Sequence, residues 1–388
     1  MVKKQTKELT VTLLFFFVLM NFVTNMSASV FNGILDQIAV EMNVSVDRTG
    51  LLSSMVSLGG GIGVPIFLIV FNKFERTKLL KITLLLNILL TIILIKINNF
   101  DVLVVLRFFM GLTSNCYAVL ATATVAMFSP KEKMGKYMAI LIMGSALAMV
   151  VGVPLTRAVS GIFTWRQIFM VLIGMMLASL VYFILNLHEG DESEQLNFKQ
   201  ELAFLKQKPV RIMIITTLIT FMGYGFQTYL TPYMVELFPS VEAYMSLILV
   251  FAGVSNFIGN AIGGVVCDKI GYYKSYILDS LLQMITAILI LLTQNSFIPH
   301  LALTFLWLAN AWFIGLQINT GINVVTNSKS RFMVSLNSSA VQLGSAIGTS
   351  IAGVIIANMG LRYTIFTSIT VSLIVFLILL LNNPKKTA

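Results

Sequence analysis

Long hydrophobic stretches, separated by short polar segments, recur along the whole chain. Each is about the length that a helix needs to cross a bilayer, which takes roughly 20 apolar residues for about 30 Å of hydrocarbon. The stretches are continuous and do not alternate, which argues against a transmembrane β-barrel. The pattern predicts twelve membrane-spanning helices, near residues 10–33, 48–71, 78–97, 101–127, 135–160, 165–187, 210–237, 244–267, 273–294, 298–325, 333–358 and 362–382.

The composition supports a chain that is surrounded mainly by lipid. Hydrophobic residues make up 57% of the 388 residues and charged residues only 11%, whereas soluble domains carry about 25% charged residues. The net charge of +10 would suit nucleic acid. The basic residues lie in short clusters between hydrophobic stretches, however, so we expect no nucleic-acid partner. Two cysteines and two histidines predict neither a disulfide framework nor a metal site.

The Lys and Arg residues are distributed unequally between the two sets of connecting segments. With the N-terminus inside, 20 of the 26 lie on the cytoplasmic side. The positive-inside rule then predicts a multi-pass protein of the cytoplasmic membrane with both termini in the cytoplasm. One cation, Arg107, lies within a span. The opposite side holds Arg48, Lys96, Arg157, Arg166 and Arg362.

One connecting segment is long and polar, and it divides the predicted spans into six plus six. We expect residues 188–208 to form a solvated cytoplasmic linker between an N-terminal six-helix bundle, residues 1–187, and a C-terminal one, residues 209–388. The connections after the second and eighth spans are similar, with Asn72 and Asp268 at an offset of 196 residues. Paired halves of this kind are typical of transporters that bind substrate near the bilayer midplane between the repeats.

Short motifs stand at the connections and within the spans. A Gly-x-x-x-Asp-Lys-x-Gly sequence follows span 8, and a degraded copy follows span 2. Span 4 carries Arg-x-x-x-Gly, and span 5 carries a glycine-rich stretch with Gly-Val-Pro. Over nearly the whole chain these motifs resemble the major facilitator superfamily and, within it, the twelve-span drug–proton antiporter family. Their residues are Asn72, Lys73, Arg76, Gly264, Asp268, Lys269 and Gly271 at the connections, and Arg107, Gly144, Gly152 and Pro154 in the spans.

The resemblance implies an all-α polytopic fold, with twelve transmembrane helices in two six-helix bundles related by pseudo-two-fold symmetry. It also implies that the connection motif latches the halves in the outward-facing state and that the bent span 5 seals them against leak. Several positions depart from the family pattern. Asn72 stands where the family has Asp, and Asp36 occupies a slot where many relatives have Pro. Thr156 and Arg157 replace small residues at the outer end of span 5.

Three ionisable residues are candidates for proton coupling: Asp36 near the outer end of span 1, Arg107 in span 4 and Asp279 in span 9. A charge inside the membrane is costly and is a functional-site hypothesis by default. Each also has a simpler interpretation. Asp36 could be an interfacial charge, Arg107 could extend to the outer interface, and Asp279 could contact the inner interface. We favour Asp36, because span 1 normally lines the central cavity in the family that the chain resembles.

Polar residues on spans 1, 4, 7 and 10 predict the substrate-binding site. Buried amides need hydrogen-bond partners, which can be a substrate or one another, and both interpretations stay open. Amides beside aromatic rings suit a polar or aromatic small molecule, and the scarcity of acids argues against a polycation. The predicted residues are Asn21, Asn25, Asn115, Tyr117, Tyr224, Gln227, Tyr229, Asn310, Gln317 and Asn319, to which Asn337 and Gln342 can be added.

These patterns predict a secondary transporter that exports a small organic molecule by alternating access, driven by the proton motive force and without a cofactor. The chain has no Gly-x-x-x-x-Gly-Lys-Ser/Thr loop for ATP and no residue cluster typical of an enzyme. We expect a monomer in the lipid bilayer. Two alternatives remain: a proton-coupled uptake symporter for a small polar solute, and a membrane scaffold or sensor that transports nothing. Drugs, nucleosides, sugars, amino-acid derivatives and metal chelators all remain candidate substrates.

Overall fold

Twelve helical segments of the protein are long and apolar enough to cross a membrane, within the residues that the structure describes. The structure is a computed structural model, and it describes residues 9–71, 74–130, 132–187, 198–327 and 330–382. The segments match the predicted spans to within a few residues, except that the seventh ends at Thr228. The prediction of a twelve-span all-α membrane protein is therefore confirmed.

Several spans consist of more than one helical element. Spans 1 to 6, here called the first half, comprise α1 (Val11–Ser29) with the 3-10 turn η1 (Val30–Gly33) and α2 (Leu35–Glu41), α3 (Val46–Thr49) with α4 (Leu51–Val70), α5 (Arg76–Leu94), α6 (Phe100–Phe128), α7 (Met134–Leu147) with the π-helical turn η2 (Ala148–Gly152) and α8 (Val153–Val159), and α9 (Trp165–Asn186). Spans 7 to 12, the second half, comprise α11 (Lys208–Met222) with α12 (Gly225–Thr228) and α13 (Leu230–Leu237), η3 (Pro239–Tyr244) with α14 (Met245–Ile270), α15 (Tyr272–Leu292), α16 (Phe297–Val325), α17 (Arg331–Met359), and η4 (Leu361–Tyr363) with α18 (Phe366–Leu381).

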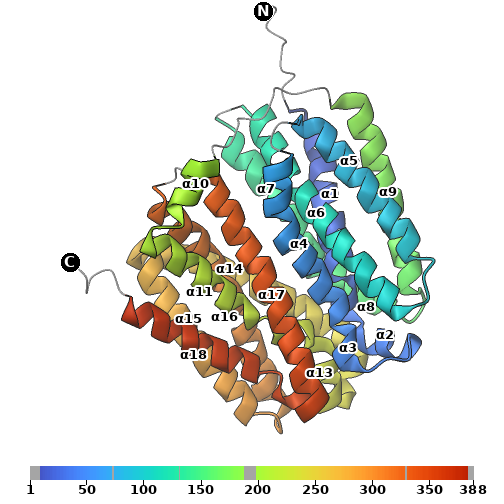
Figure 1. Cartoon of the computed structure of the whole chain (residues 1–388). Helices are drawn as coiled ribbons and strands as arrows, with labels where there is room; N and C mark the ends of the chain where they lie inside the picture. The colour runs from blue at the N-terminus through green and yellow to red at the C-terminus, as the bar shows by residue number, and fades with distance from the viewer. Residues whose placement is uncertain (1–8, 72–73, 131, 188–197, 328–329, 383–388) are drawn as a thin grey trace, which may run out of the picture.

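The two halves lie side by side, and α4 and α17 meet between them (Figure 1). One large hydrophobic core is built almost wholly from the first half. Two smaller cores fill the second half, one around Trp307 and one around Tyr276. Each half therefore has its own packed interior, which is the arrangement that rigid-body movement of one half against the other requires.

Glycines allow the closest helix crossings inside each half. A Cβ atom on Gly59 of α4 would collide with the Phe108 carbonyl of α6, and one on Gly259 of α14 would collide with the Ala309 carbonyl of α16. In lipid, apolar side chains give little net attraction between helices, and small residues let the backbones approach and pack. The α4–α6 and α14–α16 pairs are therefore equivalent contacts in the two halves.

Buried polar pairs also reveal the internal repeat. Asn87 on α5 donates to the hydroxyl of Ser114 on α6 at 2.6 Å. In the second half, Asn310 on α16 donates to Oε1 of Gln283 on α15 at 3.0 Å. Both pairs obey the offset of 196 residues that relates the connection motifs. A polar clamp between the third and fourth spans of each half is thus preserved although the residue types differ.

Two spans are bent where proline interrupts the helical hydrogen bonds. In span 5 the π-helical turn η2 precedes Pro154, which has no N–H to donate to the carbonyl of Val150. The predicted single helix over 210–237 was wrong in detail, because the chain breaks after Met222 and again at Tyr229. Pro232 explains the second break, since it cannot donate to the Thr228 carbonyl.

The predicted linker contains a short helix, α10 (Phe198–Phe204), where we expected only a solvated tether. Apolar residues stand at positions 202 and 205 near its end. Phe204 and Leu205 pack against the core around Tyr276, and the Ser330 hydroxyl bonds the Glu201 carboxylate. The end of the linker is therefore attached to the second half.

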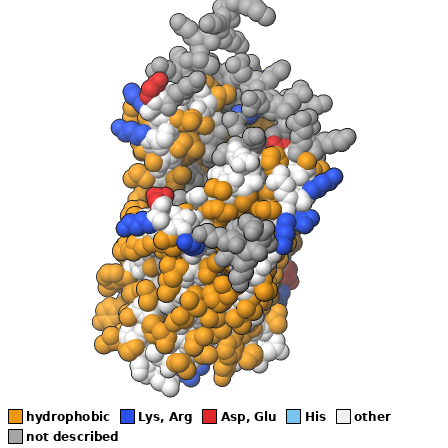
Figure 2. Space-filling model, turned by 90° about the vertical axis from the view of Figure 1, so that its left-hand side faces the viewer, with side chains coloured by type: hydrophobic (Ala, Val, Ile, Leu, Met, Phe, Trp, Pro, Cys, Tyr) orange, Lys and Arg blue, Asp and Glu red, His pale blue; other side chains and the backbone are white. Residues whose placement is uncertain are grey.

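The surface has the character expected of a protein in a bilayer. Figure 2 shows hydrophobic side chains covering most of the lower part of one face, with the Lys and Arg side chains gathered mainly above this area. Many large apolar side chains are exposed on the surface, and those of Leu292 and Ile298 are among the most exposed. Such extensive apolar exposure would be unusual for a soluble monomer.

Candidate functional site

A cavity of about 1150 Å³ lies between the two halves. Its walls come from α4, α5, α6 and α7 on one side and α11, α16 and α17 on the other. The mouth of the cavity is lined by Phe71, Phe74, Arg76 and Met134. All four lie where α4 ends and where α5 and α7 begin. The cavity therefore reaches this face of the molecule. We call it the basic face, because the described connections there carry Arg76, Lys78, Lys81, Lys133, Lys136, Lys206, Lys208, Arg211, Lys269 and Lys274.

The inner end of the cavity is polar. Gln342 on α17 donates to Oδ1 of Asn115 on α6 at 2.8 Å, a hydrogen bond that joins the two halves. The indole N–H of Trp312 and Oδ1 of Asn337 are buried and have no partner among the described residues, and both residues line the cavity. A buried donor and a buried acceptor without partners are well placed to bind a ligand, because leaving them unpaired is costly.

The charge of the cavity is low. Among the described residues that line it, Arg76 carries the single charge, and none is Asp or Glu. Phenylalanines, Trp312 and the amides of Asn319 and Asn337 form much of the remaining wall. The volume is at the upper end of the range typical of small-molecule pockets. The cavity therefore suits an organic molecule that is neutral or anionic rather than cationic.

Contacts between the halves close the cavity toward the opposite face. The Tyr229 hydroxyl donates to the Asp47 carbonyl at 2.7 Å, and the Thr231 hydroxyl donates to the Asn32 carbonyl at 3.1 Å. Nearer the middle, the Ser54 hydroxyl donates to a carbonyl of α17 at 2.9 Å. Water and solutes can therefore enter from the basic face but meet a packed barrier beyond the midplane.

The bent span 5 contributes to the same barrier. A Cβ atom on Gly253 of α14 would lie 2.8 Å from the Cα atom of Val150 in η2. A Cβ atom on Gly33 would lie 3.1 Å from the Val153 carbonyl and close to Leu249 of α14. The backbone distortion before Pro154 thus lies directly against the second half, and the sealing role that the resemblance implied for this segment stays a prediction.

Asp36, the favoured proton carrier, is in an ion pair. Nη1 of Arg157 on α8 lies 2.7 and 2.8 Å from the two carboxylate oxygens of Asp36 on α2. The Arg157 side chain is only 4% exposed, and its Nη2 lies 3.8 Å from the carboxylate of Glu242 in the second half. Asp36 is therefore part of a charge cluster at the closed face, outside the cavity.

Arg107 is fully buried at the outer end of the first half. Its guanidinium donates to the carbonyls of Leu52, Ser27 and Ala28 at 2.9, 2.7 and 2.6 Å. It also lies over the Phe31 ring, 5.0 Å from the centroid. Ser27 and Ala28 stand near the end of α1, where helix carbonyls lack internal partners. Arg107 therefore joins α1, α4 and α6, and in the described residues it contacts no carboxylate.

Asp279 lies in a second, much smaller cavity inside the second half. This cavity holds about 10 Å³, room for about one water molecule. It is lined by α11, α15, α16 and α18, through residues that include Thr220, Tyr224 and Ser372. Asp279 is 2% exposed, and its Oδ1 has no partner among the described side chains and backbone groups. It is the least compensated ionisable group that we find.

Two of the ten predicted substrate-binding residues, Asn115 and Asn319, line the large cavity. The other eight have different surroundings, and whether any of them meets substrate stays a prediction. Asn21 and Asn25 bond α7, and Tyr117 lies in the first core. The remaining five lie in the second half or at the barrier: Tyr224 beside Asp279, Asn310 and Gln317 in buried hydrogen bonds, Gln227 near the α11–α12 break, and Tyr229 at the closed face.

Trp312 was missed by the sequence reasoning, which considered amides and tyrosines. Its signal was its position in span 10, two residues from the predicted Asn310. A tryptophan is mostly apolar and is easily taken for a core or lipid-facing residue, although its indole N–H also needs a partner when buried.

The residues of the conformational motifs have varied surroundings. Asn72 and Lys73 fall outside the described residues, while Arg76 lines the mouth of the cavity. Asp268 and Lys269 are exposed at the end of α14, and Gly271 closes that helix with a φ of +80°, which favours glycine. Gly264 lies within α14, and Cβ atoms on Gly144 and Gly152 would press into α1. Their role in switching stays a prediction.

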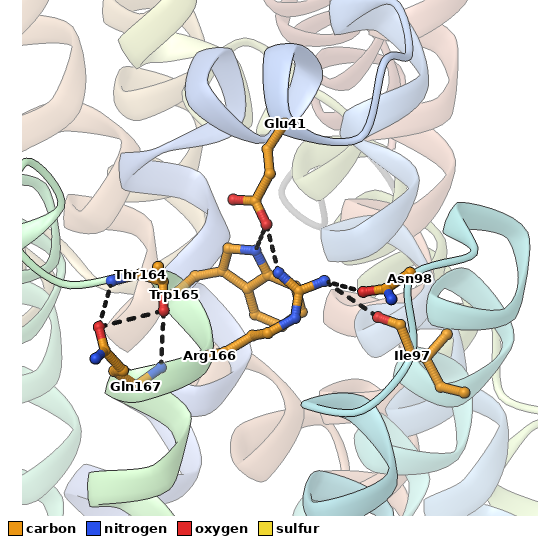
Figure 3. Close-up of polar contacts among 7 residues, drawn as sticks. All are labelled: Glu41, Ile97, Asn98, Thr164, Trp165, Arg166 and Gln167. Atoms are coloured by element: carbon orange, nitrogen blue, oxygen red, sulfur yellow. Dashed lines mark hydrogen bonds and ion pairs between the residues drawn. The ribbon is translucent and has the colours of Figure 1, made fainter.

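A polar cluster at the closed face fixes the start of α9 (Figure 3). The Glu41 carboxylate accepts a hydrogen bond from the Trp165 indole at 2.9 Å and pairs with the Arg166 guanidinium. Arg166 also donates to Oδ1 of Asn98 at 2.8 Å. Thr164 and Gln167 form a capping box. The cluster joins α2, α9 and the α5–α6 connection, so the closed face of the first half is rigidly connected.

Two six-helix halves around a central cavity define a polytopic membrane transporter. The chain belongs to the Major Facilitator Superfamily, whose family model matches residues 17–331. Proteins of this family transport solutes without a resident cofactor and are not enzymes.

Relatives and solved structures extend the match over nearly the whole chain. An uncharacterized MFS-type transporter of Bacillus subtilis, YbcL, is 25% identical over 95% of both chains. A probable sugar efflux transporter of Pasteurella multocida is 25% identical over 89% of this chain and 86% of its own. A bacterial homolog of the lysosomal transporter Spinster, in an inward-facing conformation, superposes with a TM-score of 0.73 at 13% identity, covering 98% of this chain and 97% of its own. The D-xylose–proton symporter gives a TM-score of 0.74 at 13% identity, covering 95% and 96%. The last two likenesses show the fold.

Proposed function

We propose that the protein exports a small organic molecule from the cytoplasm by alternating access, driven by protons that move inward. The observation that carries this proposal is the cavity of about 1150 Å³ that reaches the basic face and is closed toward the other. If the basic face is cytoplasmic, as the excess of Lys and Arg there indicates, the cavity is open to receive a cytoplasmic solute.

The proposed substrate is neutral or anionic and carries polar groups on a partly apolar or aromatic framework. In the described part of the chain, Arg76 is the single charged residue lining the cavity, and Trp312 and Asn337 offer one unpaired donor and one unpaired acceptor. Sugars fit this class, and the relative named as a probable sugar efflux transporter supports that choice. Organic cations fit it poorly, because no carboxylate lines the cavity among the residues that the structure describes.

The proton motive force can supply enough energy for such export. One proton moving down about 100 mV releases about 2.3 kcal/mol, and a pH difference of about one unit adds about 1.4 kcal/mol. At 1.4 kcal/mol per tenfold, one proton can sustain a gradient of roughly 500-fold for a neutral solute. We propose that Asp36, Arg107 and Asp279 take part in coupling, and their different surroundings assign them different tasks.

The surroundings divide these three residues into charges with partners and one without. Asp36 is neutralised by Arg157, and Arg107 satisfies three carbonyls. Both are suited to hold a conformation. Asp279 has a free carboxylate oxygen and no cation beside it in the described residues. It is therefore the group best suited to bind and release a proton.

The experiment begins with a search for the solute. Metabolites retained by cells with and without the protein are compared, and the strongest candidates are offered to everted membrane vesicles with an acidic lumen. Accumulation that collapses with the pH gradient supports proton-driven export. Accumulation only in right-side-out vesicles with acid outside would indicate an uptake symporter, and no flux in either preparation would indicate a scaffold or sensor.

A matched pair of variants ties the flux to the cavity. Ala118 lines the cavity, whereas Ala178 on α9 is exposed on the outside of the first half. Ala118→Trp should place an indole ring in the cavity and strongly reduce export, while Ala178→Trp should leave export unchanged. Equal flux through both variants would place the substrate path elsewhere.

A further inference from the structure

The small cavity around Asp279 is separate from the substrate cavity but shares its walls. On α11, Thr220 lines the small cavity and Phe221 lines the large one. On α16, Ala311 lines the small cavity and Trp312 the large one. Neighbouring residues of the same two helices thus face opposite sides. A single layer of helix separates Asp279 from the proposed substrate site.

The chemistry of the small cavity is that of a site for a proton and one water molecule. Thr220, Ser280, Gln283 and Ser372, whose side chains all carry an oxygen atom, line the cavity together with Asp279. A carboxylate without a cation in such a space is costly, whereas a carboxylic acid can donate its proton to water or to a hydroxyl. The volume of about 10 Å³ leaves room for roughly one water.

Few other ionisable groups face this carboxyl group. Tyr224 approaches from the break between α11 and α12. Tyr276, on the same helix as Asp279, bonds the Thr220 hydroxyl at 2.8 Å. The residues that α16 and α18 contribute to the cavity have no ionisable side chain, and α14 contributes none of its lining. A change of charge in the cavity would therefore be a change at Asp279.

The small cavity lies beside the break in span 7. Gly223 and Tyr224, which line it, are the two residues between α11 and α12. The Tyr224 hydroxyl donates to the Ala311 carbonyl, and its ring stacks on Phe221 with the centroids 4.5 Å apart. Phe221 in turn faces the large cavity. The break therefore contacts both the carboxyl group and the substrate chamber.

The same break is packed against α17, the helix that meets the first half. A Cβ atom on Gly348 of α17 would collide with the Met222 carbonyl, and one on Gly225 would collide with the Gly348 carbonyl. Further along α17, Gln342 bonds Asn115 and the Ala346 carbonyl accepts from Ser54. A shift of the break would thus move α17 and alter its contacts with the first half.

From these contacts we propose that the Asp279 cavity is the proton-binding site of the transporter, and that it acts on the span 7 break rather than by touching the substrate. A proton from water adds to the Asp279 carboxylate to give the neutral acid, and its loss restores the anion. Each change alters the hydrogen bonds around Tyr224 and moves the break, and through α17 it shifts the two halves. The inference rests on the proposed function, because it names the group that couples protons to that transport.

Infrared difference spectroscopy on the purified full-length protein tests proton binding without a substrate. Acidification should produce the carbonyl band of a protonated carboxylic acid in the wild type and in Asp36→Asn, and this band should be lost in Asp279→Asn. If Asp279→Asn does not fold, Asp279→Glu should move the band. A band that is unchanged by Asp279 variants, or an Asp279 band that is present at every pH, would overturn the proposal.

Spin labels test whether the proton moves the halves. Cysteines introduced at Lys96 and Asn295 place labels at exposed positions of the first and second halves, in a background where Cys116 and Cys267 are buried. We expect the distance between the labels to change with pH in the wild type and not in Asp279→Asn. An unaltered pH response in the variant would contradict the coupling.

These measurements distinguish a failure of the Asp279 site from a failure of the proposed export function. If vesicles show proton-driven flux that Asp279→Asn retains, the function stands and the site fails. If the Asp279 band and its pH-dependent movement are found but vesicles show no flux, the site stands and the proposed export fails.

Discussion

The carboxylate of Asp36 and the guanidinium of Arg157 form an ion pair with Nη1–O distances of 2.7 and 2.8 Å. Each residue departs from the pattern of the drug–proton antiporter family that the chain resembles, one at the end of span 1 and the other at the end of span 5. The structure shows that the two departures are partners. They are 121 positions apart in the sequence, and together they join α2 to α8 at the closed face.

This pairing predicts strong thermodynamic coupling between the two residues. Arg157 is 4% exposed and Asp36 20%, and removing one member of a buried pair costs about 3–5 kcal/mol because the other is left uncompensated. Asp36→Asn and Arg157→Gln should each lower the thermal midpoint of the purified protein. The double variant should be less damaged than the sum of the two, by about 0.5–3 kcal/mol. Additive losses would show that the pair is not coupled.

Arg157 also connects the two halves through Glu242, 3.8 Å away. The Glu242 side chain is well exposed, so we expect Glu242→Gln to shift the balance toward the state that opens at the other face only modestly, by up to about fivefold. The distance between spin labels at positions 96 and 295 reports this shift. Asp101→Asn is the matched control, because it breaks the Arg48–Asp101 pair within the first half. An equal shift in the control would refute a specific role for Glu242.

Arg107 is predicted to act through geometry rather than charge alone. Its three donated hydrogen bonds point in directions that a lysine ammonium cannot reproduce. Arg107→Lys and Arg107→Gln should both lose about 1–3 kcal/mol for each carbonyl left unpaired, seen as a lower thermal midpoint and a lower yield of folded protein. A fully stable Arg107→Lys variant with normal flux would instead indicate that the positive charge is what matters.

The glycine crossings give a prediction about packing. Gly59→Ala would push its methyl group into the Phe108 carbonyl, whereas Gly174→Ala on α9 would meet no atom within 4 Å. We expect Gly59→Ala to lower the thermal midpoint and Gly174→Ala to leave it unchanged or raise it, by about 0.5–1 kcal/mol from helix propensity. The thermal midpoint of Gly59→Ala should be the lower of the two. A lower midpoint for Gly174→Ala would contradict the close packing of α4 against α6 at Gly59.

The two tryptophans of α16 provide a matched pair of Trp→Phe substitutions, one in a core and one in the cavity wall. The Trp307 indole N–H donates to the Ser368 hydroxyl at 2.8 Å inside the second half, while that of Trp312 has no partner in the described structure and its residue lines the cavity. Trp307→Phe should reduce stability without changing substrate affinity. Trp312→Phe should raise the KM for the exported molecule about three- to tenfold, the value of one hydrogen bond. Unchanged KM in Trp312→Phe would remove Trp312 from the binding site.

Much of the architecture was available from the order of residues alone. Runs of about 20 apolar residues predict membrane-spanning helices because lipid cannot satisfy an open backbone, and the resulting spans agree with the structure to within a few residues. The offset of 196 residues between Asn72 and Asp268 also predicted the relationship between the halves, and the buried pairs Asn87–Ser114 and Asn310–Gln283 share it.

The hydrogen-bond and ion-pair partners of the polar side chains could not be predicted from the sequence. Asn115, Asn310 and Gln317 look alike as amides in apolar spans, yet Asn115 lines the cavity and the other two bond neighbouring helices within the second half. At the level of sequence, Asp36 is favoured over Asp279 as the proton carrier, but Asp36 lies beside Arg157 and Asp279 has an unpaired oxygen. Helix formation depends on neighbours along the chain, which a sequence displays directly. Hydrogen bonding and charge compensation depend on which helices touch and how each is rotated, and these become definite when all twelve spans are packed together.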